Sequence, residues 1–222
     1  MMEDGRPIVV VGGGGHAKVV IEILLAAGWR VAGYTDASGR PGDAFAGVPW
    51  LGDDGALPAA LSRGVRHAIV ALGDNALRGR LLAKVEALGF TPGNAVHPGA
   101  VVSPTAVLGR GVALMAGAIL NAAVTLGDGS IVNTGATVDH DGRIGRAVHI
   151  APGAHLAGTV TVEDLALIGV GSIVGRGRPL RIGRGAVVGS GSVVIEDVPD
   201  GTTVVGNPAR PIARRVLPGD FE

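Results

Sequence analysis

The stretch IVNTGA-TVDHDG-RIGRAV, residues 131–148, consists of three six-residue units whose second residues are Val132, Val138 and Ile144. The spacing continues in both directions, because every sixth residue from Val96 to Val174 is Leu, Ile or Val, at fourteen positions in one phase. A period of six matches neither an α-helix nor a β-hairpin, whereas a short strand followed by a turn, stacked coil upon coil, has this repeat. The stretch therefore predicts a parallel β-helix in which each unit points one aliphatic side chain inward.

The repeat also predicts the size of the coil. With three units and eighteen residues to a coil, the repeats form between five and six coils, roughly 25 Å long at the spacing of paired strands. The phase slips by two residues between Gly175 and Arg181 and resumes at Ile182. A β-sandwich with accidental spacing is the alternative, but chance would not keep one phase over so many units. The pattern leaves the hand of the coil open, and the general rule for parallel crossovers favours a right-handed one.

The first part of the chain has a different pattern, in which strands and helices alternate. This order predicts a small α/β domain with a parallel sheet, which we place at residues 1–93, followed by the β-helix and a C-terminal cap at residues 94–222. The predicted strands are Ile8–Val11, Trp29–Tyr34 and His67–Leu72, and the predicted helices are Ala17–Ala27 and Ala76–Leu88.

Composition limits the classes of function. The chain has 222 residues, with 19 basic and 19 acidic side chains and no cysteine. The balanced charge offers no basic surface for nucleic acid or a membrane, and the lack of cysteine excludes disulfides and a thiol nucleophile. No apolar run approaches the roughly 18 residues of a spanning helix, and the N-terminus lacks the apolar core of a signal peptide. We therefore expect a soluble, cytoplasmic protein.

A glycine-rich loop, Gly12–His16, separates the first predicted strand from the first helix. Glycines there let backbone N–H groups approach a phosphate, and an acid at the end of the next strand, Asp36, suits a ribose hydroxyl. The dinucleotide fingerprint is incomplete, so three hypotheses stand: a nucleotide-sugar site, an NAD site or a structural turn. The small size of the domain argues against NAD. Gly73 and Asn75 end the third strand at the same edge of the sheet, and we expect them to line this pocket.

Two of the six histidines suggest acid–base chemistry. Acyl transfer to an amine requires removal of one proton, and imidazole suits that task near neutral pH. His140 lies between Asp139 and Asp141, and a neighbouring carboxylate can orient an imidazole and raise its basicity. His149 follows nine residues later, half a coil away, so the two rings of one chain should not meet. A site that uses both would lie between subunits, although each histidine also has a plain surface role as its alternative.

The repeat [Leu/Ile/Val]-Gly-x-x-[small]-x resembles the hexapeptide acyltransferase family, and Val205–Arg210 (VGNPAR) is similar to the motif that closes its last coil. The resemblance implies a left-handed coil, a homotrimer and acetyl-CoA as co-substrate. No closed set of three histidine ligands is present, so we predict no metal.

A narrower resemblance covers nearly the whole chain. The stretches Val10–Ala17, Leu72–Asn75, Asn133–Thr134 and Asp139–Asp141 resemble bacterial sugar acyltransferases of surface-glycan synthesis, including pilin-glycan and perosamine N-acetyltransferases and sialic acid O-acetyltransferases. The resemblance implies that His140 is the general base and Asp141, which is Glu in some relatives, its orienting acid. It implies acceptor-binding residues at Gly13, Gly14, Gly15, His16, Asp36, Gly73, Asn75 and Asn133, and acetyl-CoA contacts at His149, Gly158, Val170 and Ser190.

These observations lead to one expected function. We expect an acetyl-CoA-dependent N-acetyltransferase acting on a UDP- or GDP-linked 4-amino sugar in bacterial surface-glycan (lipopolysaccharide O-antigen) synthesis, with sites between the subunits of a homotrimer. An O-acetyltransferase of a sialic-acid-like sugar is the nearest alternative, and a non-catalytic β-helix scaffold is a third. Arg176 and Arg178, within the two-residue slip, either face CoA phosphates or belong to a solvated loop.

Overall fold

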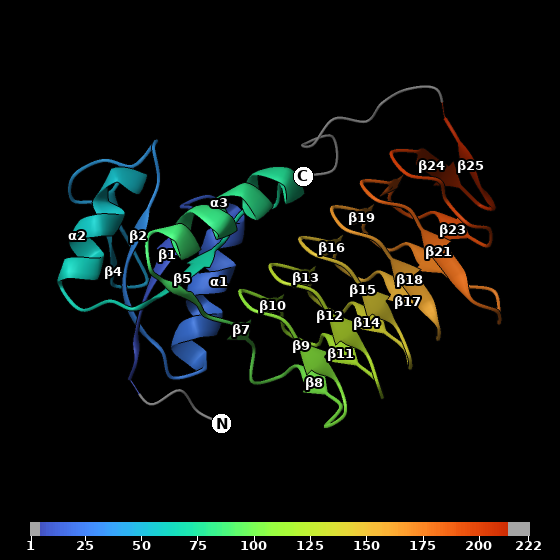
Figure 1. The fold of residues 1–222 in the computed structure, drawn as a ribbon, viewed down its shortest axis with the longest axis horizontal. Coiled ribbons are helices and arrows are strands. Elements are labelled where there is room, and N and C mark those ends of the chain that lie inside the picture. The colour runs from blue at the N-terminus through green and yellow to red at the C-terminus, as the bar shows by residue number, and fades with distance from the viewer. Residues whose placement is uncertain (1–4, 213–222) are drawn as a thin grey trace.

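The computed structural model describes residues 5–212, so the predicted domain limits at residues 1 and 222 lie outside the described part. A small α/β unit is followed by a long parallel coil, and helix α3 (Asn75–Ala87) lies in the seam between them (Figure 1). The chain passes from one sheet system to the other between β6 (Thr91–Pro92) and β7 (Ala95–Val96). Within residues 5–212, no helix combines the length and the apolar character needed to span a bilayer.

The N-terminal sheet has the strand order β3-β4-β2-β1-β5-β6, and all its neighbours are parallel except β3 and β4. Residues 36–66, for which the sequence predicted no element, contain a hairpin and two short helices. The hairpin turns at Ala46 and Gly47, which both have positive φ angles as a two-residue hairpin turn requires. The elements are β1 (Pro7–Val11), β2 (Arg30–Thr35), β3 (Ala44–Phe45), β4 (Val48–Gly52), η1 (Asp54–Ala56), α2 (Leu57–Ser62) and β5 (His67–Val70).

Helix α1 (Gly15–Ala26) begins two residues before its predicted start, because the last glycines of the loop already form the first turn. One side of the helix packs on the sheet through Val20 and Leu24, and it also covers the coil. Ala113 and Ile131 of the coil are buried in the same apolar cluster. The α/β unit is therefore packed against one face of the coil and shares a core with it.

The coil is a left-handed parallel β-helix with three faces. The right-handed crossover rule does not hold here, since it depends on twisted strands joined through a helix, whereas these strands are only two to four residues long. Face I contains β7 (Ala95–Val96), β10 (Ala113–Leu114), β13 (Ile131–Val132), β16 (His149–Ile150), β19 (Leu167–Ile168), β22 (Val187–Val188) and β24 (Thr203–Gly206), with β25 (Ala209–Pro211) added antiparallel. Face II contains β8 (Val101–Val102), β11 (Ile119–Leu120), β14 (Thr137–Val138), β17 (His155–Leu156), β20 (Ile173–Val174) and β23 (Val193–Val194). Face III contains β9 (Val107–Leu108), β12 (Thr125–Leu126), β15 (Arg143–Ile144), β18 (Val160–Val162) and β21 (Leu180–Ile182).

The register confirms the eighteen-residue coil and its interruption. Ile131 pairs with His149 and Ile144 with Val162, each eighteen residues on, whereas Val162 pairs with Ile182. The two extra residues lie in the turn from face II to face III. The predicted aliphatic residues form the interior, in a cluster that runs through the whole coil. The six-residue period therefore marks the side chains that pack in the interior of the coil.

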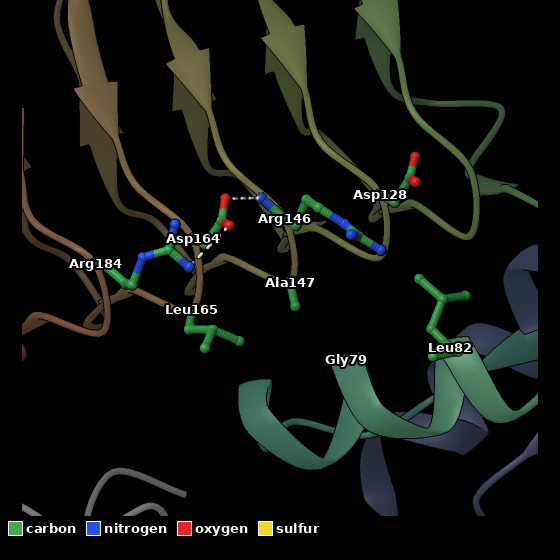
Figure 2. A pocket seen from close by; sticks show the side chains of 9 residues that line it. Gly79, Leu82, Asp128, Arg146, Ala147, Asp164, Leu165 and Arg184 are labelled. Carbon is green, nitrogen blue, oxygen red and sulfur yellow. Dashed lines mark hydrogen bonds and ion pairs between the residues drawn. The ribbon is translucent and has the colours of Figure 1, made fainter.

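Positive and negative residues alternate along the corner between faces III and I, a pattern that the period of six does not predict. Successive coils place there Arg110, Asp128, Arg146, Asp164, Arg184 and Asp200. The Asp164 carboxylate accepts from the backbone N–H of Arg146 at 2.8 Å and pairs with the Arg184 guanidinium at 3.1 Å. Figure 2 shows this corner facing helix α3 across a cavity of about 240 Å³. Four of these residues, Asp128, Arg146, Asp164 and Arg184, line this cavity in the seam between the two parts of the chain.

Candidate active site

His140 lies in the turn from β14 to β15, at the corner between faces II and III. Its Nδ1 is 2.9 Å from Oδ2 of Asp141. Asp141 has a φ of 57°, a left-handed conformation that aspartate tolerates better than most residues. The backbone N–H of His140 donates to Oδ1 of Asp139, which also accepts from the side chain of Asn121. The predicted orientation of the imidazole by the adjacent acid is therefore present in a single chain.

The electrostatics of this corner favour a proton on the imidazole. The hydrogen bond to Asp141 raises the pKa of His140 above its ordinary value, and the charges of Asp139 and Asp141 add to the effect. The side chain is more than half exposed. Because Nδ1 is occupied by Asp141, Nε2 is the nitrogen available to exchange a proton with a bound molecule.

Gly158 lies directly beneath this imidazole, one coil further along the same corner. A Cβ at this position would come within 2.4 Å of Nε2 of His140. The next residue, Thr159, donates its backbone N–H to the carbonyl of His140 at 2.9 Å. Gly158, predicted as an acetyl-CoA contact, is thus packed against the imidazole of the candidate base.

The glycine loop is held by Asp36. The backbone N–H of Gly13 donates to Oδ2 of Asp36 at 2.8 Å, and the other oxygen accepts from the backbone of Ser38. A Cβ on Gly13 would lie 2.8 Å from Cβ of Asp36, so this close approach requires glycine. Asp36 therefore positions the glycine loop. It also follows the last residue of β2 directly, the place where the sequence predicts contact with a ribose.

Gly14 and Gly15 differ from Gly13 in having open space where a side chain would be. Both are exposed, and Gly14 is the N-cap of α1. The protein's own packing does not require glycine at these two positions, whereas a ligand lying against the backbone would. The free N–H groups and the dipole of the helix start are suited to a phosphate group.

The loop meets the coil at a pair of histidines. The rings of His16, at the start of α1, and His149, on face I, have centroids 6.1 Å apart. Burial and the positive charge of Arg78 lower the pKa of His16 to about 4 and that of His149 to about 3, so both imidazoles are neutral near pH 7. Nε2 of His16 is buried without a hydrogen-bond partner among the described residues. His149 therefore lies beside the glycine loop, on a different face from His140, as the half-coil spacing predicts.

Asn133 and Asn75 occupy different surroundings. Nδ2 of Asn133 is 3.1 Å from Nε2 of His149, so it belongs to the histidine pair. The Asn75 amide donates to the carbonyls of Leu165 and Ala166 on the coil. Its role as a pocket-lining residue stays a prediction, because its described contacts join α3 to the coil. Gly73, in the preceding turn, provides the backbone hydrogen-bond partner of His149.

Arg78 is only 1% exposed and lies at the centre of these contacts, although its sequence context does not predict such a role. Its position near the start of a polar helix resembles that of any surface arginine. The neighbouring Gly73-Asp74-Asn75 motif was the only signal close to it. The burial of Arg78 depends on the docking of the coil, which a local pattern does not reveal.

Val170 and Ser190, the other predicted acetyl-CoA contacts, are exposed at the corner between faces I and II. The two are stacked, since the carbonyl of Val170 accepts from the backbone of Gly191. His140 and Gly158 lie instead at the corner between faces II and III. One chain therefore does not bring the predicted base and these two residues together.

The two-residue insertion has an internal charge partner. Arg176 and Arg178 both pair with Glu196. These three side chains together carry one net positive charge. Among residues 5–212, no group of three or more histidine, aspartate or glutamate side chains is arranged to hold a metal ion.

Comparison with known proteins adds a second line of evidence. The model of the PglD N-terminal domain family matches residues 7–85. No curated protein sequence matches the chain significantly. A structure of a histidine variant of GDP-perosamine N-acetyltransferase from Caulobacter crescentus, in complex with CoA and GDP-perosamine, is 47% identical, covers 94% of this chain and 97% of its own, and has a TM-score of 0.89.

Two further solved structures are similar over almost the same length. The acetyltransferase domain of PglB from Neisseria gonorrhoeae is 40% identical, covers 94% of this chain and 100% of its own, and has a TM-score of 0.86. WeeI from Acinetobacter baumannii is 29% identical, covers 93% and 100%, and has a TM-score of 0.81. The similarity therefore includes the α/β unit and the coil together.

Proposed function

This chain belongs to the hexapeptide-repeat sugar acyltransferases, and we propose that it transfers the acetyl group of acetyl-CoA to the amine of a nucleotide-linked 4-amino sugar. The 47% identity to an enzyme crystallised with CoA and GDP-perosamine, over 94% of the chain, is the observation that carries this proposal. It also favours a GDP-linked over a UDP-linked acceptor. The product would serve the synthesis of a bacterial surface glycan such as an O-antigen.

The chemistry assigns the proton to His140. The amine nitrogen attacks the thioester carbonyl carbon, a C–N bond forms, and the proton lost by the nitrogen passes to Nε2 of His140. The C–S bond then breaks, and the sulfur leaves as the thiol after taking that proton. Asp141 holds Nδ1 throughout, which keeps Nε2 directed outward and stabilises the imidazolium. Backbone N–H groups of the coil are available for the oxyanion.

The acceptor and the donor occupy different parts of the proposed site. The exposed backbone of Gly14 and Gly15 at the start of α1 would hold the acceptor's diphosphate, with His16, Asp36 and Asn133 nearby. Acetyl-CoA would lie along the coil, past Gly158 on one corner and Val170 and Ser190 on another. Because these corners are separate in one chain, the proposal includes a homotrimer whose sites lie between subunits.

The test is turnover by His140 variants. We expect His140→Ala and His140→Asn to lower kcat by about 10²–10⁴-fold, the usual contribution of a general base, with unchanged oligomeric state in solution. Near-normal turnover by a folded variant would remove His140 from this role.

A panel of amino and hydroxy nucleotide sugars identifies the acceptor. We expect faster acetylation of GDP-linked 4-amino sugars than of their UDP-linked counterparts or of hydroxy sugars. Transfer only to hydroxyl groups would favour an O-acetyltransferase. Calorimetry with CoA addresses the scaffold alternative, since a non-catalytic coil would not bind it.

A further inference from the structure

Arg78 is an arginine buried in the seam between α3 and the coil. All three guanidinium nitrogens donate hydrogen bonds, and among the described residues the acceptors are carbonyl oxygens rather than carboxylates. A buried charge is costly unless its donors are satisfied. Burial lowers the pKa of Arg78 to about 9, which still leaves it charged near neutral pH.

These acceptors belong to both parts of the chain. Nη1 donates to the carbonyls of Leu72 and Gly73, at 2.9 and 3.0 Å, just after β5. On the coil, Nε donates to Gly129 at 2.7 Å, and Nη2 donates to Ala147 at 2.9 Å and Val148 at 3.3 Å. Arg78 thus joins the carboxyl edge of the sheet to two successive turns of the corner between faces III and I.

His149 lies next to two backbone carbonyls that accept hydrogen bonds from Arg78, those of Gly73 and Val148. Arg78 binds the carbonyl of Val148, the residue before His149, and the imidazole of His149 hydrogen-bonds the backbone of Gly73, whose carbonyl Arg78 also binds. Its Nε2 is 3.1 Å from Nδ2 of Asn133. Oδ1 of Asn133 accepts from the backbone of Thr134 at 2.7 Å, so the Asn133 NH₂ group faces the imidazole. Nε2 of His149 must therefore be the acceptor, and the ring proton is on Nδ1.

We propose that Arg78 is a positioning residue that keeps His149 in the neutral tautomer with its proton on Nδ1 and thereby fixes the side-chain amide of Asn133. The part of Asn133 in binding the sugar nucleotide rests on the proposed function. Arg78 touches neither Asn133 nor the glycine loop among its described contacts, so it acts through His149.

The charges around His149 support this assignment. Besides burial, Arg78 from α3 and His16 from α1 lower the pKa of His149, while Asp74 at the start of α3 acts on Arg78. A proton on Nε2 would face the donor NH₂ group of Asn133. The amide would then have to turn over and lose its bond to Thr134. Loss of the Arg78 charge raises the pKa of His149. Protonation of Nε2, and with it the turning of the Asn133 amide, would then occur closer to neutral pH.

The first test is ¹⁵N NMR of histidine-labelled protein without substrates, with the His149 signal assigned from a His149→Gln variant. We expect His149 of the wild type to remain neutral with its proton on Nδ1 from pH 5 to 8. A protonated His149, or a proton on Nε2, would overturn the proposal without any Arg78 variant. In Arg78→Met we expect a mixture of tautomers and a titration shifted upward by about one pH unit or more. Arg80→Met, at an exposed position of the same helix, should leave the signal unchanged.

The second test is a double-mutant cycle on kcat/KM for the nucleotide sugar. We expect Arg78→Met to lower kcat/KM by about 10–100-fold through misplacement of Asn133, and to add little once Asn133→Ala is present. Fully additive losses would contradict action through Asn133. The NMR result is independent of substrate, so an inactive wild type would reject the proposed function and still leave the tautomer measurable.

Discussion

At the scale of single residues, the environment of His140 is set by its immediate neighbours. The carboxylates of Asp139 and Asp141 are adjacent in sequence, and the structure shows which one binds the ring. Asp139 instead accepts from the backbone N–H of His140 and from the side chain of Asn121 in the preceding coil. The two acids therefore have different tasks, and the sequence alone does not separate these tasks.

The hydrogen bond from Asp141 leads to a prediction about pH. Only neutral His140 accepts a proton, so activity should fall as pH drops through its pKa, which Asp141 raises. Replacing the carboxylate in Asp141→Asn removes this effect, so we expect the acid limb of kcat/KM to move to lower pH while the maximum rate decreases. The pH–rate profile of both proteins is the measurement. A limb that stays in place would mean that another group controls it.

Gly158 provides a steric prediction. A methyl group in Gly158→Ala would come within 2.4 Å of Nε2 of His140 and displace the ring. We expect kcat/KM to fall by about 10–100-fold, because small displacements of a reacting group are costly, with a nearly unchanged melting temperature. Steady-state kinetics beside thermal unfolding checks both expectations. Retained activity would show that the position of the His140 ring does not depend on glycine at position 158.

Among the secondary-structure elements, glycine has opposite effects on stability in the coil and in α3. A Cβ at Gly145 would lie 2.6 Å from the backbone nitrogen of Asp164 in the next coil. A Cβ at Gly79 of α3 would make an ordinary contact with Ala147 at 3.5 Å. Glycine in the hexad is therefore required by the approach of two coils, whereas glycine in α3 only lowers helix propensity.

This contrast predicts stability changes of opposite sign. We expect Gly145→Ala to destabilise the protein by about 1–3 kcal/mol through overpacking, and Gly79→Ala to stabilise it by up to about 1 kcal/mol through helix propensity. Chemical denaturation of the two variants beside the wild type measures the difference. Loss of stability in Gly79→Ala would indicate that the seam with the coil has no room for a methyl group.

In the whole molecule, the candidate residues of one chain face in different directions. His140 and Gly158 share one corner of the coil, and Val170 and Ser190 share another. The third corner faces α3 (Figure 2). The α/β unit covers face I beside His149. These positions support a site assembled between copies of the chain.

Mixing two inactive variants tests that arrangement. We expect His140→Ala and Ser190→Trp to be inactive alone, and their co-refolded mixture to regain activity at about a quarter of the sites for random assembly between subunits. Regain occurs because some sites then combine an intact His140 corner with an intact Ser190 corner. Activity per site after co-refolding is the measurement, and a mixture that stays inactive would favour a site within one chain.

The sequence is enough to predict the coil, the phase slip, the glycine loop and the His140–Asp141 pair, because each consists of neighbouring residues or of a repeat of constant length. The hairpin of β3 and β4, the contacts of Asn75 and the burial of Arg78 depend instead on how distant segments pack together. Asn75 binds Ala166, 91 residues away, and Arg78 binds Gly129, 51 residues away. No local pattern encodes such contacts, because they depend on how the α/β unit docks on the coil. That docking buries an ordinary helix arginine where its charge lowers the pKa of both His16 and His149.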